Sequence, residues 1–275
     1  MGDTLVTPGF PEAPGAAVDW PALDRRIADV VDQVQRTGQI VVPGHEPYKL
    51  QHHINPDEGR VLRDLVAQHR PKQTLEIGMG TGLSGLYICW GLARAGGGRH
   101  VAIDPFQKAE FWQGRGLALR DHVGLTPVFD WIGQPDDLAL PRMVAEGRKI
   151  DFALIDGDHR FEAALLDFYY IDKLLPVGGI CTIDDTDWPS VWRVVQFALL
   201  HRDYEWVAGV PVDLGPWTRP WGWKLRLRRW STFRKQGWPM SEAMRRKPYQ
   251  FVALRKTRDQ LKPEQFWANF ERLNH

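Results

Sequence analysis

The sequence predicts an α/β protein with a doubly wound, mostly parallel seven-stranded sheet and an antiparallel C-terminal strand pair. Short apolar runs of strand length alternate with segments whose apolar residues recur at helical spacing, and this alternation is typical of a parallel sheet. Near the C-terminus, two further strand-like runs are separated by a long segment without a helical period, which indicates an antiparallel edge pair. With 275 residues, 43% of them hydrophobic, the chain can bury the core that such a sheet requires.

The individual elements follow from local patterns. Residues 1–19 are rich in Pro, Gly and Ala, so we expect a disordered arm there and a single domain over residues 20–275. Helical spacing predicts helices over 20–37 and 56–69, and Gly38 stands where the C-terminal cap of the first helix is expected. The strands expected after them are 74–77, 100–103, 126–131, 150–155 and 180–183, then 206–210 and 249–255 as the antiparallel pair. The helices expected among these strands are 83–95, 107–122, 136–147, 160–175 and 187–201.

The composition argues against several classes of protein. The 35 Lys and Arg against 34 Asp and Glu leave a net charge of +1, which does not suit a chain whose whole surface binds nucleic acid. The two cysteines, Cys89 and Cys181, lie in apolar runs, so the sequence offers no disulfide framework and no cysteine-type zinc site. No apolar run is long enough to span a membrane, and the first residues lack the pattern of a signal peptide. We therefore expect a cytoplasmic protein with no transmembrane segment.

A glycine-rich turn follows the first strand of the predicted sheet, at residues 76–82 (EIGMGTG). Alternating glycines let the backbone pass close to a ligand, and the next helix presents unpaired N–H groups at its start. Ligands of such sheets bind at the carboxyl ends of the strands, so we expect a nucleotide-like group here. Asp104, at the end of the second strand, can accept both ribose hydroxyls of an adenosine.

Two classes of adenosine cofactor compete for this turn. Residues 80–85 fit the dinucleotide fingerprint G-x-G-x-x-G, which makes an NAD(P)-dependent oxidoreductase the alternative. However, the fingerprint would begin two residues after Gly78, whereas its first glycine should follow the strand almost immediately. The carboxylate of Glu76 would also repel a pyrophosphate, but it suits the cationic amino-acid end of S-adenosylmethionine. The turn therefore favours S-adenosylmethionine.

Carboxylates also gather after two later strands of the predicted sheet, where the chain reads IDGDH at 155–159 and IDDTD at 183–187. If these strands are neighbours, several carboxylates converge at one edge and require a compensating charge. Mg²⁺ or another divalent cation held by Asp156, Asp184 and Asp185 would supply it. The alternative is a set of separate hydrated loop acids or helix N-caps, which Asp187 fits well.

The ensemble of these motifs resembles a known family. Segments 75–84 (LEIGMGTGLS), 103–107 (IDPFQ), 155–159 and 176–180 (PVGGI), with Asp184-Asp185, are similar to class I S-adenosylmethionine-dependent methyltransferases, which have a Rossmann-like fold. The resemblance covers about residues 50–210 and is strongest to the metal-dependent catechol, caffeoyl-CoA and macrolide-sugar O-methyltransferases. It implies an enzyme that methylates a hydroxyl of a small molecule or sugar with the help of Mg²⁺.

The resemblance also implies roles for individual residues. The residues around the methionine part, the ribose and the adenine of the cofactor would be Glu76, Gly78, Gly80, Gly82, Ser84, Asp104, Gln134, Pro135, Asp136 and Asp156. The metal ligands of the family match Asp156, Asp184 and Asp185. Residues 52–54 precede the helix before the first strand, where relatives fold a segment over the cofactor.

The proton acceptor is where this sequence departs from the family. Catechol-type relatives carry lysine at the position of His159, and sugar-type relatives use an aspartate that matches Asp158, so Asp158 and His159 are the candidate catalytic residues. A histidine accepts protons near neutral pH without any perturbation of its pKa. Asp158 would instead require a hydroxyl strongly acidified by the metal. Contact with backbone at the start of a helix is the alternative for His159.

Residues 211–247 form a basic insertion with a net charge of +8, which leaves −7 on the rest of the chain. Interleaved with the charges are Trp217, Trp221, Trp223, Trp230 and Trp238. We expect a cap or lid for the acceptor, with an anionic acceptor as one option, because the Trp residues are irregularly spaced among Pro and Gly. A homo-oligomer contact is another option. A non-catalytic module that binds nucleic acid or a membrane surface through this insertion is the alternative, although we expect no nucleic acid as partner.

Overall fold

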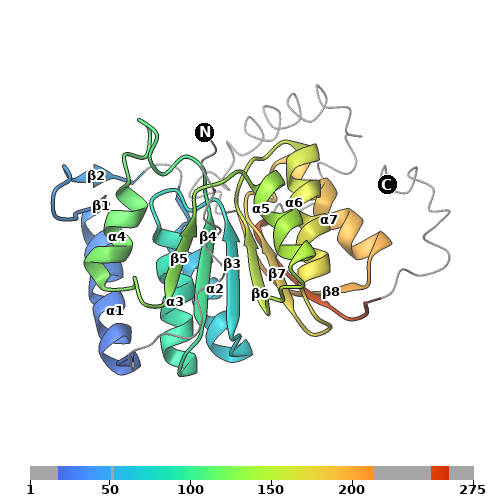
Figure 1. The fold of residues 1–275 in the computed structure, drawn as a ribbon, viewed down its shortest axis with the longest axis horizontal. Helices are drawn as coiled ribbons and strands as arrows, with labels where there is room; N and C mark the ends of the chain where they lie inside the picture. The colour runs from blue at the N-terminus through green and yellow to red at the C-terminus, as the bar shows by residue number, and fades with distance from the viewer. Residues whose placement is uncertain (1–17, 51–52, 213–248, 260–275) are drawn as a thin grey trace, which may run out of the picture. The chain divides into compact units, whose positions relative to one another are not determined.

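The computed structural model describes residues 18–50, 53–212 and 249–259 (Figure 1). Nearly all of the expected N-terminal arm (1–19) and of the basic insertion (211–247) lies outside these residues, as does His52. Among the described helices, none has the length and apolar character needed to cross a membrane.

Seven strands form one sheet in the order β5-β4-β3-β6-β7-β9-β8. Their bounds are β3 Gln73–Ile77, β4 Arg99–Ile103, β5 Phe129–Ile132, β6 Phe152–Ile155, β7 Ile180–Ile183, β8 Tyr204–Pro211 and β9 Tyr249–Lys256. The chain order reverses between β3 and β6, which makes their carboxyl ends the switch point where ligands of such sheets bind. β4 with β5 and β6 with β7 pair parallel, whereas β9 pairs antiparallel with both β7 and β8. The predicted fold class is confirmed.

The chain divides into two compact units, the first made of the residues up to Thr74 together with Met79–Gly133. Its helices are α1 Trp20–Thr37, α2 Pro56–His69, α3 Leu83–Ala95 and α4 Arg115–Val123. α3 is buried on nearly all sides, because α1 and α2 both pack on it. A Cβ on Gly59 would lie 2.2 Å from the ring of Tyr87, so a glycine is needed where α2 crosses α3.

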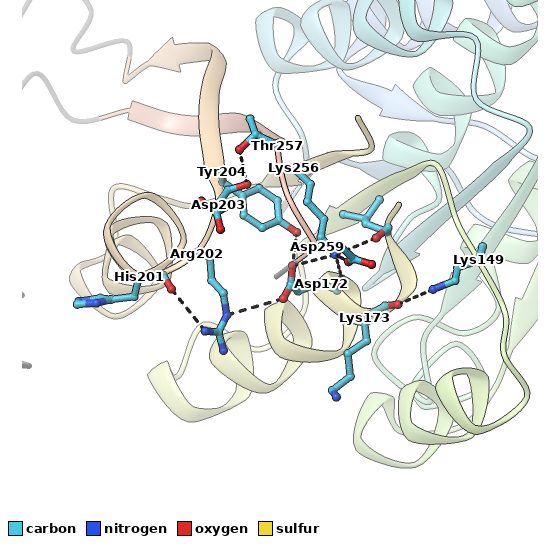
Figure 2. A network of polar contacts seen from close by, with 11 residues as sticks. Lys149, Asp172, Lys173, His201, Arg202, Asp203, Tyr204, Lys256, Thr257 and Asp259 are labelled. Atoms are coloured by element: carbon cyan, nitrogen blue, oxygen red, sulfur yellow. Dashed lines mark hydrogen bonds and ion pairs between the residues drawn. The ribbon is translucent and has the colours of Figure 1, made fainter. Parts of the chain in front are cut away.

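The second unit contains Leu75–Gly78 and the residues from Gln134 onward. Its helices are α5 Asp136–Ala145, α6 Phe161–Leu174 and α7 Pro189–His201, and α6 packs against both α5 and α7 (Figure 1). A buried polar network joins α6 to the antiparallel strand pair, and Figure 2 shows Lys256, Tyr204 and Arg202 around Asp172. The Nζ atom of Lys256 donates to the backbone oxygens of Asp172 and Leu175, at 2.6 and 3.0 Å.

Two expectations about local structure need correction. The helix expected over 107–122 begins only at Arg115, because Gly114 takes a left-handed conformation (φ 72°) and side-chain hydrogen bonds hold residues 105–114 in turns. The strand expected over 126–131 spans Phe129–Ile132, since residues 125–128 form a turn that contains Pro127. A small hairpin of β1 Gln39–Ile40 and β2 Tyr48–Lys49 was not predicted, because two-residue strands carry no periodic signal.

Candidate functional site

The turn after β3 depends on its glycines. Gly78 has a φ of 87°, and a Cβ on it would lie 2.1 Å from the backbone oxygen of Asp156, so only glycine lets these two chain segments approach. Gly82 has a φ of 81° and precedes the first residue of α3. Glu76 lies at the end of β3 and is fully buried, and Ser84 is buried in the first turn of α3. The predicted residues thus occupy the turn and the helix start that were expected for them.

In the first unit, the carboxylate of Asp104 organises this turn. Its Oδ2 atom accepts hydrogen bonds from the backbone N–H groups of Met79 and Gly80, at 3.2 and 3.0 Å, and its Oδ1 atom accepts one from Phe106 at 2.7 Å. The side chain is 4% exposed. A carboxylate oxygen can accept two hydrogen bonds, so Oδ1 has capacity for a further donor. The acid at the end of β4 and the glycine turn after β3 therefore form one structure.

Gln107 completes this arrangement, and the sequence analysis assigned it no role. Its Nε2 atom donates to the backbone oxygen of Gly80 at 2.7 Å and to Oδ2 of Asp104 at 2.8 Å. The side chain is fully buried. A Cβ on Gly116 would lie 2.7 Å from Oε1 of Gln107, so a glycine on α4 makes room for it. Its position three residues after Asp104 is a weak signal, because burial cannot be read from spacing alone.

In the second unit, three potential ligand groups converge after β6 and β7. Atoms of Asp156, His159 and Asp185 all lie within 4.8 Å of one another. The Nε2 atom of His159 is 2.8 Å from Oδ2 of Asp185 and 3.9 Å from Oδ1 of Asp156. The parallel ladder places these groups, since the N–H of Asp156 donates to Ile77 and that of Asp184 to Ile155. Asp185 takes a left-handed φ of 50°, an uncommon conformation for a non-glycine residue.

The electrostatics of these three groups suit a cation. Burial raises the pKa of Asp156 to about 6, against the lowering effect of His159. Contact with Asp156 and then Asp185 raises the pKa of His159 to about 10. Although Nε2 of His159 is buried and close to both carboxylates, it is not aligned with either oxygen as a hydrogen bond requires, within the described part of the chain. With this pKa the imidazole is protonated at neutral pH and balances the two carboxylates, and a divalent cation that displaced this proton would find two oxygen ligands and one nitrogen ligand within 4.8 Å of one another.

Two residues that the sequence predicted for the site, Asp184 and Asp158, are not part of this group of three among the described residues. Asp184 is buried and its Oδ1 atom accepts a hydrogen bond from the N–H of Asp185 at 2.9 Å, and among the described residues it is not part of the converging set. Asp158 accepts hydrogen bonds from the N–H and the Nε atom of Arg160, at 2.9 and 2.8 Å. The side-chain hydrogen bond from Arg160 lowers the pKa of Asp158, which makes this carboxylate a weaker proton acceptor.

Trp188 is a further residue that the sequence analysis did not assign. Its indole stacks on the imidazole of His159, with ring centroids 5.7 Å apart and planes 16° apart, and it is 52% exposed. A Trp placed directly after an acidic strand end and before the Pro that begins α7 could have been noticed. In the same unit, Gln134, Pro135 and Asp136 form the start of α5, where Oδ1 of Asp136 accepts from the N–H of Asp137.

Residues 75–186 match a family model described as a methyltransferase domain. The chain is 28% identical over 160 residues to a flavonoid 3',5'-methyltransferase of Vitis vinifera, covering 57% of this chain and 65% of the relative. It is 28% identical over 138 residues to a caffeoyl-CoA O-methyltransferase of Stellaria longipes, covering 49% of this chain and 54% of the relative. The chain thus spans between about half and two thirds of the length of these relatives.

The fold is similar to that of an O-methyltransferase from Bacillus cereus solved in complex with SAH. The two structures superpose with a TM-score of 0.54 over 84% of this chain and 91% of the other, at 15% sequence identity. At this identity the likeness concerns the fold.

Proposed function

We propose that this chain, whose residues 75–186 match a methyltransferase-domain family model, is a class I S-adenosylmethionine-dependent O-methyltransferase. The observation that carries the proposal is the bonding of the Asp104 carboxylate to the N–H groups of Met79 and Gly80. These hydrogen bonds hold Asp104, which would accept the ribose hydroxyls, against the glycine turn, which would lie beside the rest of the cofactor. The dinucleotide fingerprint would begin at Gly80, three residues after the end of β3, whereas its first glycine should follow the strand almost immediately. This spacing disfavours the alternative of an NAD(P)-dependent oxidoreductase.

The cofactor residues proposed from the sequence keep their roles. Glu76 would face the cationic amino-acid end, Asp104 the ribose through Oδ1, and Gln134–Asp136 the adenine. When bound, S-adenosylmethionine supplies a methyl group on a sulfonium sulfur. The task of the protein is to hold an acceptor oxygen in line with that methyl and to exclude water, and this orientation supplies much of the rate.

Asp156, Asp185 and His159 would hold a divalent cation, Mg²⁺ or Mn²⁺. Asp184, the remaining predicted ligand, lies directly after β7 and next to Asp185 in the chain. A bound cation lowers the pKa of a hydroxyl that it contacts. The proton of the acceptor must then leave, and we keep His159 and Asp158 as the two candidate acceptors. The salt bridge from Arg160 weakens Asp158 as an acceptor, because a carboxylate with a lowered pKa attracts a proton less strongly. His159 could accept the proton only when a cation held by Asp156 and Asp185 has displaced the proton that its own raised pKa implies.

The acceptor would be a hydroxyl of a small molecule or sugar. The exposed half of the Trp188 ring offers it an apolar surface beside His159. An anionic acceptor was inferred from residues 211–247, and these lie almost wholly outside the described residues. We further propose that residues 20–275 form a single domain. Light scattering of the purified protein tests whether it assembles as a homo-oligomer. The chain has only two cysteines and both are buried, which supports a reducing, cytoplasmic setting.

Calorimetry with S-adenosylmethionine, its demethylated product and NAD(P)H tests the proposed function. We expect micromolar binding of the first two and none of NAD(P)H. Asp104→Ala should weaken cofactor binding by about 10- to 100-fold, because hydrogen bonds to a charged acceptor contribute about 1.5–3 kcal/mol. Asp121→Ala, at an exposed acid of α4, is the matched control and should bind as the wild type does. Tight binding of NAD(P)H alone would show that the assignment is wrong.

A further inference from the structure

A buried acid on α6 has no place in the site described above. Asp167 lies in the middle of this helix and is 0% exposed. Within the described residues, neither of its carboxyl oxygens has a hydrogen-bond donor. An ionised carboxylate in such a position would be strongly disfavoured, since burial removes its hydration and nothing replaces it. The side chain must therefore be neutral or share a proton with a neighbour.

The neighbour is Asp136, at the start of α5. A Cβ on Gly157 would lie 3.6 Å from Oδ2 of Asp167 and 3.9 Å from Oδ2 of Asp136, so both carboxyl groups converge on this glycine. Both the charge and the side chain of Asp136 act to raise the pKa of Asp167, as expected for two carboxyl groups that lie close together. Two carboxylates are both acceptors, so such a contact is favourable only when one of them carries a proton.

The proton belongs to Asp167. Burial, followed by the charge of Asp136, raises the pKa of Asp167 to about 9. The other charges that shift it belong to Asp158 and Asp137, and both are negative. Burial, followed by the charges of Asp172 and Asp167, raises the pKa of the Cys181 thiol on β7. Asp136 is half-exposed and its Oδ1 atom already accepts from the N–H of Asp137, so it is the better solvated of the two carboxyl groups.

We propose that Asp167 is a positioning residue whose neutral carboxyl group donates a hydrogen bond to the carboxylate of Asp136. This bond fixes the start of α5, and with it Gln134–Asp136, on α6. The inference rests on the proposed function, in which these residues face the adenine of the cofactor. Gly157 leaves room at this point, because a Cβ there would lie only 3.1 Å from Cγ2 of Ile77 while touching both acids at ordinary van der Waals distance.

Two substitutions separate this role from general packing. Asp167→Asn keeps a donor of the same shape, so the affinity for S-adenosylhomocysteine should stay within about threefold of the wild type. Asp167→Leu keeps volume but removes the donor, and it should weaken this affinity by about tenfold or more. Glu162→Gln, at an exposed acid of the same helix, is the control and should change nothing. The wild-type affinity should also fall above about pH 9, and that of Asp167→Asn should not.

Carbon-13 spectra of the aspartate carboxyl groups test the proton directly and need no cofactor. In the wild type at pH 7 we expect one protonated carboxyl resonance, which Asp167→Asn abolishes. Its absence, or an affinity in Asp167→Asn as low as in Asp167→Leu, would overturn the proposal. If Asp167→Leu does not fold, the spectra and the pH profile of Asp167→Asn still decide. A wild type that shows the resonance but binds no S-adenosylhomocysteine would overturn the proposed function and leave the carboxyl pair supported.

Discussion

The Nε2 atom of His159 lies 2.8 Å from the Oδ2 atom of Asp185, and 3.9 Å separate it from Oδ1 of Asp156. The imidazole therefore stands inside the acidic group at the ends of β6 and β7. A histidine in this position can be a ligand of a cation as well as a proton acceptor, and the two roles predict different results for the same substitution.

His159→Ala should reduce Mn²⁺ affinity by about tenfold or more, because it removes one of three converging ligand atoms. Titration of the purified protein, followed by calorimetry or by the electron paramagnetic resonance of free Mn²⁺, measures this. Asp158→Asn is the matched control, since Asp158 is engaged by Arg160, and it should bind Mn²⁺ normally. Unchanged Mn²⁺ binding in His159→Ala, together with lost methyl transfer, would instead assign the histidine as the proton acceptor alone.

Methyl transfer should disappear in the presence of a chelator and return when Mg²⁺ or Mn²⁺ is added in excess. Asp156→Asn and Asp185→Asn should each prevent this recovery, because each removes a carboxylate of the converging group. Asp185→Asn should still bind S-adenosylhomocysteine, because Asp185 lies after the end of β7 and is not among the proposed cofactor residues. Transfer rates that do not respond to chelation would mean that the acidic group holds no essential metal.

Gln107→Leu should weaken S-adenosylhomocysteine binding by about tenfold, since it removes the hydrogen bonds to Gly80 and Asp104 while the volume is kept. Calorimetry measures the effect, and a thermal melt shows whether the fold is intact. Gln113→Leu makes the same change at an exposed position of the same loop and should leave affinity unaltered. Equal affinities for the two variants would show that the turn is held without Gln107.

Lys256→Met should lower the free energy of unfolding by about 1.5–3 kcal/mol. Lys256 is only 3% exposed and its ammonium group donates to the backbone oxygens of Asp172 and Leu175, so its removal leaves buried acceptors without this donor (Figure 2). Urea unfolding measures the loss. Lys173→Met, at an exposed lysine whose Nζ atom lies over the Tyr169 ring, should cost much less, and equal costs would contradict the role given to Lys256.

Asp167→Asn should change how stability depends on pH. The pKa of Asp167 is about 9 in the folded protein against an ordinary value of 3.8, so between these pH values the folded state holds a proton that the unfolded state has lost. The stabilising contribution is thus full below about pH 4 and is lost as the pH rises to about 9, by up to about 1.4 kcal/mol per pH unit. The variant lacks this term, so its stability relative to the wild type should grow with pH.

Urea unfolding of both proteins at several values between pH 5 and 9 checks this expectation. Glu162→Gln should follow the wild-type pH dependence, because Glu162 is exposed. Wild-type and Asp167→Asn curves that run parallel across this range would show that Asp167 is ionised in the folded protein.

The sequence by itself determined the order of the elements, the glycine turn and the acids at the strand ends. Helix and strand periodicity reports local burial, and Gly78 and Gly82 are required by their own left-handed conformations. The resemblance to class I methyltransferases rested on the same local motifs, and residues 75–186 match a family model described as a methyltransferase domain.

Only the tertiary structure decided which side chains meet. The pairing of β6 with β7 and the conformation of Asp185 bring His159, rather than Asp184, to the group with Asp156. Likewise, Asp136 and Asp167 come into contact only because α5 packs against α6, and no spacing in the sequence announces it. The physical reason is that periodicity records whether a residue is buried, whereas a hydrogen bond or a ligand group depends on distances of a few ångströms between residues far apart in the chain.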